Sequence, residues 1–536
     1  MAAIGSRGSS GSINAWVNYG RLEGHSRIED DGILAFVSNS SFLHKNSFDG
    51  FRAVQEADFN ELWVLDLKGD ARTSGEDRRR QGGNIFGDQI KVGIAIYCFV
   101  KKKGSKGFKI FYDAVRDYAK ADEKMEFIQA PLSTRTMQEL RPDARHNWLN
   151  LPSAEFEQFI PIATKETKAT KIEGQERAIF KLFSLGISTN RDEWLYDRDQ
   201  KVLTKKVRQL IGAYDAIPPT TKTYPDTLKW SRNLKRRLAR NEREPFSAKR
   251  IVQASYRPYS PRWLYQSDVF TDELGLADEL FPPTGKNVGI SFSAPGFRTN
   301  YCALAVEGVA DLHFGAAVDG YQQVTRYRFE GGKRLDNVTD WALSQFRTHY
   351  GDNGITKDNI FAYVYAVLHD PKYHQTFTSN LKREFPRVPF HRDFKRWCTW
   401  GKSLLDLHLG YLSAKPYALK RTDVSDAKAR SAAQKPRVIL RADERAGTIV
   451  LDTETQLSGI PGEAWEYKLG NRSALEWVLD QHKERQTKDV SLRRLKLAPY
   501  SFSDHKEGVI DLLKRVTTVS LNTVEIVDAM KKEPRA

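Results

Sequence analysis

The sequence is poor in cysteine, with Cys98, Cys302 and Cys398 scattered along 536 residues. No pair has the spacing of metal ligands, which argues against a zinc site or a disulfide framework and for a reduced protein. No apolar run approaches the roughly 20 residues of a transmembrane helix. The N-terminus, MAAIGSRGSSGSINAW, has one arginine and no apolar core, so it does not read as a signal peptide. We therefore expect a cytoplasmic protein with no membrane partner.

The familiar catalytic motifs are also missing. The chain has no G-x-G-x-x-G, no Walker A loop, no H-E-x-x-H and no G-x-S-x-G. Asp311–His313 and Asp406–His408 each place an aspartate two residues before a histidine. A metal or acid–base role is conceivable, but a histidine held by a local hydrogen bond in an aromatic core is the favoured interpretation.

What the sequence does contain is positive charge. Lysine and arginine total 84 against 68 aspartates and glutamates, a net charge of +16 with a pI near 9.4. Such an excess favours a polyanionic partner, nucleic acid before a ribosome or membrane surface. The stretch KWSRNLKRRLARNEREP (229–245) predicts a basic helix carrying Arg236 and Arg237. Its face could contact phosphates or simply be solvated.

Three apolar runs near the start predict strands, at residues 33–37, 62–67 and 92–100. The segment 46–59 between the first two has helical spacing. Because a helix joins them, the first two strands should be parallel and adjacent. The third follows without a helix and is expected to be antiparallel.

Changes in composition and in predicted secondary structure along the chain suggest four parts. Residues 1–27 are rich in glycine and serine and predict a flexible lead. An α/β layer occupies 28–107, a mostly helical and polar connector 108–250, and an aromatic-rich mixed α+β region 251–536. The predicted boundaries therefore lie near residues 107 and 250.

The charged loop 68–91 joins the second and third strands. Gly82 and Gly83 would allow close backbone approach, and Phe86 follows them. Phe86 could stack on an unstacked base or cap the core. The loop's arginines could meet phosphates or pair with Glu76 and Asp77; they are Arg72, Arg78, Arg79 and Arg80.

Several blocks carry a family resemblance. They include GILAFVSNSSFL (32–43), FNELWVLDLKGDARTSGEDRRRQGGNIF (59–86) and IKVGIAIYCFVKK (90–102). These resemble the second half of a gamma-class adenine-N6 DNA methyltransferase domain, and more narrowly the Type ISP restriction-modification enzymes. Further matching blocks follow in order, from YRPYSPRWLY (256–265) to TVSLNTVEIVDAM (518–530).

The resemblance implies a fold and a chemistry. Residues 28–107 would form the C-terminal half of a partial Rossmann-like methyltransferase sheet, and 251–536 a target recognition domain. S-adenosylmethionine would donate the methyl group to a flipped adenine, and Phe86 matches the aromatic face that holds this base. The donor-binding glycine loop and the Asn-Pro-Pro-Tyr motif of such enzymes do not occur in this sequence. We therefore expect a truncation, split gene or fragment that is incomplete for catalysis.

Three functions remain as alternatives. The first is DNA binding and target recognition, with double-stranded DNA as partner and nuclease or helicase modules elsewhere. The second is a specificity subunit that completes a methyltransferase encoded on a separate chain. The third is a structural or RNA-associated basic protein. Candidate base-reading segments are 256–262, 296–300 and 320–333.

Overall fold

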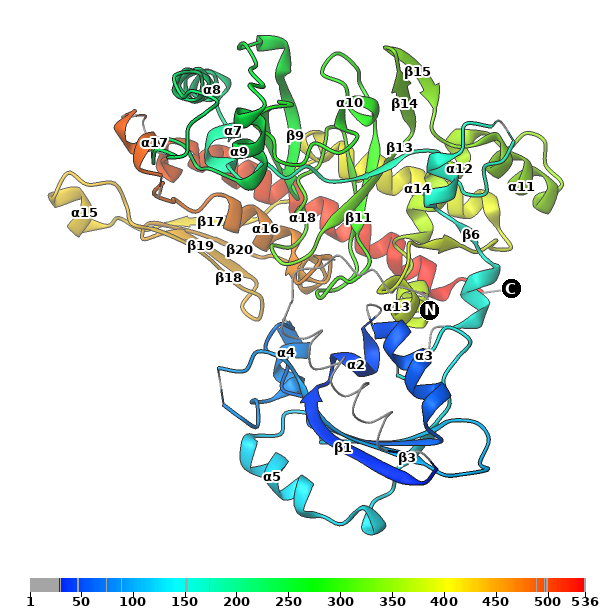
Figure 1. Cartoon of the computed structure of the whole chain (residues 1–536). Helices are drawn as coiled ribbons and strands as arrows, with labels where there is room; N and C mark the ends of the chain where they lie inside the picture. Colours follow the sequence, from blue (N-terminus) through cyan, green and yellow to red (C-terminus); the bar gives the residue numbers. More distant parts are fainter. Residues whose placement is uncertain are drawn as a thin grey trace. The chain divides into compact units, whose positions relative to one another are not determined.

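The computed structural model describes residues 28, 30–45, 48–73, 75–87, 89–149, 153–172, 174–487, 489–495, 497 and 500–534. The predicted lead, 1–27, lies outside these residues. The chain forms two compact units, Met1–Pro152 and Ser153–Ala536 (Figure 1). Each is a mixed α/β structure with its own hydrophobic core.

The first unit is built on a five-stranded sheet with the order β1-β3-β2-β4-β5. Strand β3 is antiparallel to both β1 and β2, β4 is parallel to β2, and β5 is antiparallel to β4. The strands are β1 (Gly32–Asn39), β2 (Glu61–Asp66), β3 (Ile94–Lys101), β4 (Lys109–Ala114) and β5 (Gln138–Leu140). The helices are α2 (Ser41–His44), α3 (Asp49–Asp58), α4 (Gly75–Gln81) and α5 (Ala121–Gln129).

The antiparallel direction of the third strand is confirmed, but the predicted adjacency of the first two is wrong. β3 lies between β1 and β2, and Phe99 on β3 is the register partner of both Leu34 and Leu62. Tyr97 and Phe99 are fully buried, and β3 takes a partner strand on each side. A helical crossover makes β1 and β2 parallel, but it does not determine whether they are neighbours, so a later strand can insert between them.

The second unit contains several small sheets with helices packed among them. The larger sheets have the orders β8-β10-β9, β12-β11-β13-β7 and β17-β20-β19-β18. The strands are β6 (Ile160–Pro161), β7 (Phe183–Leu185), β8 (Tyr196–Asp197), β9 (Ile251–Arg257), β10 (Ser260–Tyr265), β11 (Gly289–Ser293), β12 (Ala303–Val306), β13 (Tyr321–Thr325), β14 (Tyr327–Glu330), β15 (Lys333–Asp336), β16 (Arg387–Val388), β17 (Lys420–Asp423), β18 (Val438–Asp443), β19 (Thr448–Asp452), β20 (Thr455–Ser458), β21 (Lys468–Leu469) and β22 (Arg472–Ser473).

The helices of this unit range from a single turn to 31 residues. They are α6 (Lys165–Ala169), α7 (Asp192–Leu195), α8 (Gln200–Asp215), α9 (Arg232–Ala239), α10 (Ala277–Leu280), α11 (Asp340–Tyr350), α12 (Lys357–Val367), α13 (Pro371–Leu381), α14 (Phe394–Leu409), α15 (Ala427–Ser431), α16 (Ala474–Gln481), α17 (Val490–Arg494) and α18 (Phe502–Lys532). α18 packs against α13, α14 and α16 (Figure 1). None of the helices in the described part of the chain is both long and apolar enough to cross a membrane.

The predicted helical connector at 108–250 does not match the structure. Strands β4 and β5 extend the first sheet to residue 140, past the predicted boundary at 107. Strand β7 pairs with β13, so one sheet joins residues on both sides of the predicted boundary at 250. These strands are two to six residues long. Strands this short carry too little periodicity to be separated from helix or loop.

Candidate nucleic-acid interface

The charged loop of the first unit presents an exposed aromatic ring. It runs from β2 to β3 and contains the helix α4, which the sequence did not predict. Phe86 follows this helix and is 59% exposed, so it does not cap the core. Its backbone N–H donates to the side-chain oxygen of Asn84, at 3.0 Å. The ring therefore lies on the surface while its backbone is held.

Asn84 is the anchor of this loop. Its side chain is buried, and its amide nitrogen donates to the backbone oxygen of Val92 (2.8 Å) and, more weakly, to that of Gly69 (3.4 Å). These bonds tie both ends of the loop to one side chain, while the Asn84 oxygen accepts from Phe86. Loss of Asn84 would leave three polar groups without partners and free the loop.

Lys124 fixes the other side of the same loop. Its ammonium donates to the backbone oxygens of Gln81 (2.9 Å) and Gly83 (2.6 Å), and burial lowers its pKa to about 8. Gly82 between them has φ +64°, and a Cβ there would lie 2.1 Å from the backbone oxygen of Ala119. No local sequence pattern signals this role of Lys124, because the contact joins residues some 40 positions apart.

The four predicted arginines of this loop differ in their exposure and in their contacts. Arg72, Arg79 and Arg80 are exposed, and Arg79 and Arg80 also interact with other groups in the protein. Arg78 is half-buried and donates to the backbone oxygen of Gly82, at 2.7 Å. Arg78 thus supports the loop, while the other three offer charge at its surface.

The two candidate arginines on the basic helix α9 of the second unit differ in their exposure and contacts. Arg237 points inward, and its guanidinium donates to the backbone oxygens of Val269 (2.9 Å) and Thr271 (2.7 Å). Arg236 is exposed and lines a surface cavity of about 500 Å³ whose other lining residues include Arg232 and the acidic Asp272 and Glu273. Adjacent arginines therefore have different tasks: Arg237 holds the segment after β10, and Arg236 is available to a partner.

Both histidines of the Asp-x-His pairs make hydrogen bonds within the protein. Asp311 forms an ion pair with Arg257 at 2.6 Å, and His313 bonds to the backbone oxygen of Asp319. His408 is fully enclosed and bonds to Tyr365. Within the described residues, no cluster of three or more His, Cys, Asp or Glu side chains could hold a metal ion.

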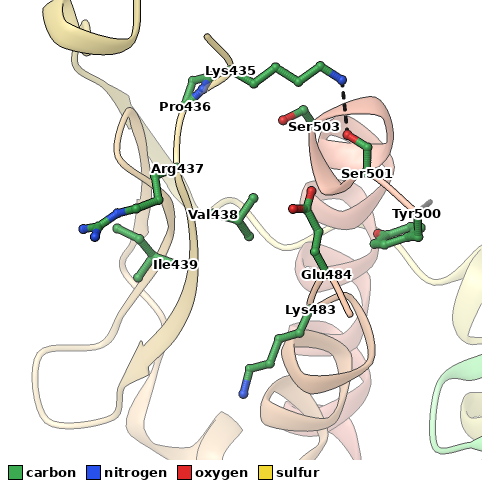
Figure 2. A pocket seen from close by; sticks show the side chains of 10 residues that line it. All are labelled: Lys435, Pro436, Arg437, Val438, Ile439, Lys483, Glu484, Tyr500, Ser501 and Ser503. Atoms are coloured by element: carbon green, nitrogen blue, oxygen red, sulfur yellow. Dashed lines mark hydrogen bonds between the residues drawn. The ribbon is translucent and has the colours of Figure 1, made fainter. Parts of the chain in front are cut away.

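A second cavity, of about 700 Å³, lies where α18 begins (Figure 2). Its lysines are paired: Lys435 contacts Ser501 (3.2 Å) and Asp504 (2.6 Å), and Lys483 lies 3.5 Å from Asp480. Arg437 points away from Lys435 and Ser501. The charges of this cavity are largely balanced by acidic neighbours, so it is a weak candidate for binding a polyanion.

Comparison with known proteins identifies what the chain is similar to. Residues 178–512 match the family model of the Type ISP C-terminal specificity domain. The cryo-EM structure of a DrdV–DNA complex is 43% identical with a TM-score of 0.85, covering 96% of this chain and 52% of that one. A search of curated proteins found no match.

Two further solved structures are similar over nearly the whole chain. A nuclease-deletion mutant of the Type ISP restriction-modification enzyme LlaGI, in complex with a DNA substrate mimic, is 26% identical with a TM-score of 0.78; the match covers 96% of this chain and 47% of that one. The ATP-dependent Type ISP restriction-modification enzyme LlaBIII, bound to DNA, shares the fold at 22% identity and a TM-score of 0.82, covering 99% of this chain and 36% of that one. The present chain thus spans about half or less of the length of these proteins.

Proposed function

The chain belongs to the Type ISP C-terminal specificity domain family, and we propose that it binds double-stranded DNA and recognises the target site of a restriction-modification enzyme. The observation that carries this proposal is the match to the DrdV–DNA complex over 96% of the chain at 43% identity. The net charge of +16 supports it, because DNA affinity depends strongly on neutralised phosphates. Among the alternatives, the RNA-associated protein has no such support.

The experiment that tests this function is equilibrium binding of the full chain to labelled duplexes across a range of salt concentrations. We expect affinity to fall steeply with salt for every duplex, and one sequence class to bind at least about a thousandfold more tightly than the rest. Equal affinity for all sequences would support the general basic protein instead.

We further propose that the first unit belongs to an adenine-N6 methyltransferase domain, in which Phe86 stacks on the extruded target base. A base must leave the duplex to be modified, and an exposed aromatic face can hold it there. Arg72, Arg79 and Arg80 would contact the phosphates beside that base. Asn84 and Lys124 would keep the loop in one conformation before DNA arrives, which lowers the entropic cost of binding.

The chain lacks the sequence motifs that would bind the methyl donor. S-adenosylmethionine, when bound in such enzymes, supplies the methyl group, but the residues present here do not fit it. The sequence lacks both the donor-binding glycine loop and the Asn-Pro-Pro-Tyr motif. We therefore propose that the remainder of the methyltransferase, and any nuclease or helicase module, comes from other parts of the enzyme or from a separate chain.

Substitution of Phe86 tests the stacking role. We expect Phe86→Ala to weaken binding of a site whose target adenine is left unpaired by about tenfold, since one base–aromatic stack is worth ~1–3 kcal/mol. Phe86→Trp should retain that affinity. The measurement compares duplexes that carry the preferred site with each adenine unpaired in turn. If Phe86→Ala binds all of these as the wild type does, Phe86 does not hold the base.

The neighbouring arginines of α9 provide a matched pair. Arg236→Ala should weaken binding of all duplexes alike, by roughly threefold to tenfold, and reduce the salt dependence by about one phosphate contact. Arg237→Ala should instead destabilise the fold by about 2 kcal/mol, because it strands buried carbonyl groups. Salt-titrated binding and thermal melting of both variants separate the roles; reversed outcomes would contradict the assignment.

A further inference from the structure

Two loops of the second unit are locked together by one buried carboxylate. Residues 294–302 join β11 to β12, and residues 313–319 precede β13. Asp319, 2% exposed, accepts hydrogen bonds from the backbone N–H groups of Arg298 (2.8 Å) and Thr299 (2.9 Å) and from the Thr299 hydroxyl (2.5 Å). Three bonds to a single buried acid fix the backbone of the first loop at the position of Arg298.

A third loop, between β21 and β22, packs against the same place. Gly470 has φ +65°, and a Cβ there would lie 2.8 Å from the backbone oxygen of Gly315. Asn300 reaches this loop as well, since its side-chain nitrogen and the Gly470 oxygen are 3.4 Å apart. Segments more than 150 residues apart in the sequence therefore form one surface, the three-loop surface, made of 294–302, 313–319 and 470–472.

The side chains on this surface are unlike those of a phosphate-binding patch. Arg298 is exposed, and its guanidinium forms no ion pair with another residue in the described part of the chain. Val318, next to the buried Asp319, is 47% exposed. Asn300 is exposed beside them, whereas Arg472 already pairs with Asp480 at 3.1 Å. Within the three loops, one available cation stands among amide and apolar groups, and Lys382, whose ammonium lies 5.8 Å from the centre of the Phe297 ring, is the cation next to them. Such a surface offers shape and hydrogen bonds more than bulk charge.

These groups match the edges of base pairs in the major groove. Arginine donates two parallel hydrogen bonds to O6 and N7 of guanine, asparagine pairs with adenine, and an apolar side chain contacts the methyl group of thymine. Such contacts discriminate between bases only if their backbone is held, because a mobile loop adapts to the wrong base. The Asp319 hydrogen bonds supply that rigidity.

We propose that the three-loop surface reads base pairs of the target site, with Arg298 specifying a guanine and Val318 contacting an adjacent thymine methyl group. Asp319 is a positioning residue that holds Arg298 in place. This inference rests on the proposed function, DNA target recognition, and names the residues that carry its specificity.

The test is selection of preferred duplexes from a random pool by the full chain and its variants. Arg298→Ala should lose preference for guanine at one position, by roughly 10- to 100-fold, and keep the rest of the selected site. Arg298→Lys retains the charge but not the paired donors, so it should lose the same preference with little loss of overall affinity. Val318→Ser should relax one neighbouring thymine. Arg236→Ala, which removes an equal charge from α9, should weaken binding of every duplex alike and leave the base preference at each position of the selected site as in the wild type.

The possible outcomes distinguish a failure of this inference from a failure of the proposed function, DNA target recognition. Arg298 and Val318 are on the surface, so their variants should melt as the wild type does, and a changed selection cannot be blamed on unfolding. If Arg298→Ala and Arg298→Lys select the wild-type site with the wild-type preference at every position, the inference is overturned while DNA recognition stands. If the wild type itself selects no sequence, the proposed function fails instead.

Discussion

Between pH 6.5 and pH 4.5, the second unit is expected to lose stability by on the order of 5 kcal/mol for each pH unit, which brings it close to unfolding at the acidic end. Burial lowers the pKa of three of its histidines to about 4 and that of a fourth well below its ordinary value; they are His369, His374, His482 and His408. In the unfolded chain each would bind a proton near pH 6.5.

The sign follows from which state binds more protons. Between pH 6.5 and 4, the unfolded chain protonates these histidines and the folded chain does not, so stability falls as the pH falls. Each histidine costs roughly 1.4 kcal/mol per pH unit in this window. Over two pH units the four together would cost on the order of 10 kcal/mol, which is comparable to the typical stability of a domain, about 5–15 kcal/mol.

The surroundings of His408 show why the neutral form is required. The N–H of Ala305 donates to the Tyr365 hydroxyl (2.8 Å), which leaves that hydroxyl to donate to Nδ1 of His408 (2.6 Å). Nε2 of His408 then donates to the Thr523 hydroxyl (3.0 Å). A proton on Nδ1 would remove the lone pair that accepts from the Tyr365 hydroxyl, so the hydroxyl proton of Tyr365 would lose its acceptor. The chain of bonds links β12, α12, α14 and α18, so its loss would loosen all four.

Thermal unfolding followed by circular dichroism at pH 7.5, 6.0 and 5.0 measures this effect. In His408→Gln the side chain at residue 408 cannot titrate. The stability of this variant, although lower at pH 7.5, should therefore fall less steeply with decreasing pH, by roughly 1.4 kcal/mol per pH unit. An unfolding temperature that stays constant from pH 7.5 to 5.0, or buried histidines that titrate near pH 6.5, would contradict the prediction.

The substitution Gly401→Ala is expected to cost about 3 kcal/mol or more and to separate two central helices. A Cβ at residue 401 on α14 would lie 1.8 Å from the backbone oxygen of Ala362 on α12. Neither side can yield cheaply, because the obstacle is backbone and α12 is buried throughout its second and third turns. Overpacking of this kind destabilises by moving whole elements rather than one side chain.

Gly508→Ala is the matched control. Gly508 lies in the interior of α18, and a Cβ there would meet nothing within 4 Å. The same change should stabilise that helix by up to about 1 kcal/mol, since alanine loses less backbone entropy than glycine. Denaturant unfolding of both variants measures the contrast. Equal effects at the two positions would mean that the close approach of α12 and α14 does not determine the cost.

Much of the first unit could be predicted from the sequence. Its first three strands are long apolar runs, and the amphipathic helix at 46–59 corresponds to α3 (Asp49–Asp58). The exposed position of Phe86 agrees with its place after glycines in a charged loop, while its stacking role stays a prediction. The position of β3 between β1 and β2 could not be derived, because strand order depends on contacts between segments that no local pattern records.

Residues that support the candidate sites through hydrogen bonds are harder to predict from the sequence than the exposed residues that would contact DNA. Arg236 and Arg237 look alike in sequence, and only the fold shows that Arg237 bonds to backbone carbonyl groups. Asn84 and Asp319 act through hydrogen bonds to loops that the fold brings near them. Segment 296–300 was predicted as a base reader from its composition, but its support by Asp319 and Gly470 is a tertiary property.

The central claim is that this chain reads a DNA sequence, and selection from a random duplex pool by the purified full chain tests it most directly. The account predicts enrichment of one short site that contains a guanine, bound at least about a thousandfold more tightly than random DNA at physiological salt. Uniform recovery of the pool, with affinity that depends on salt but not on sequence, would contradict it.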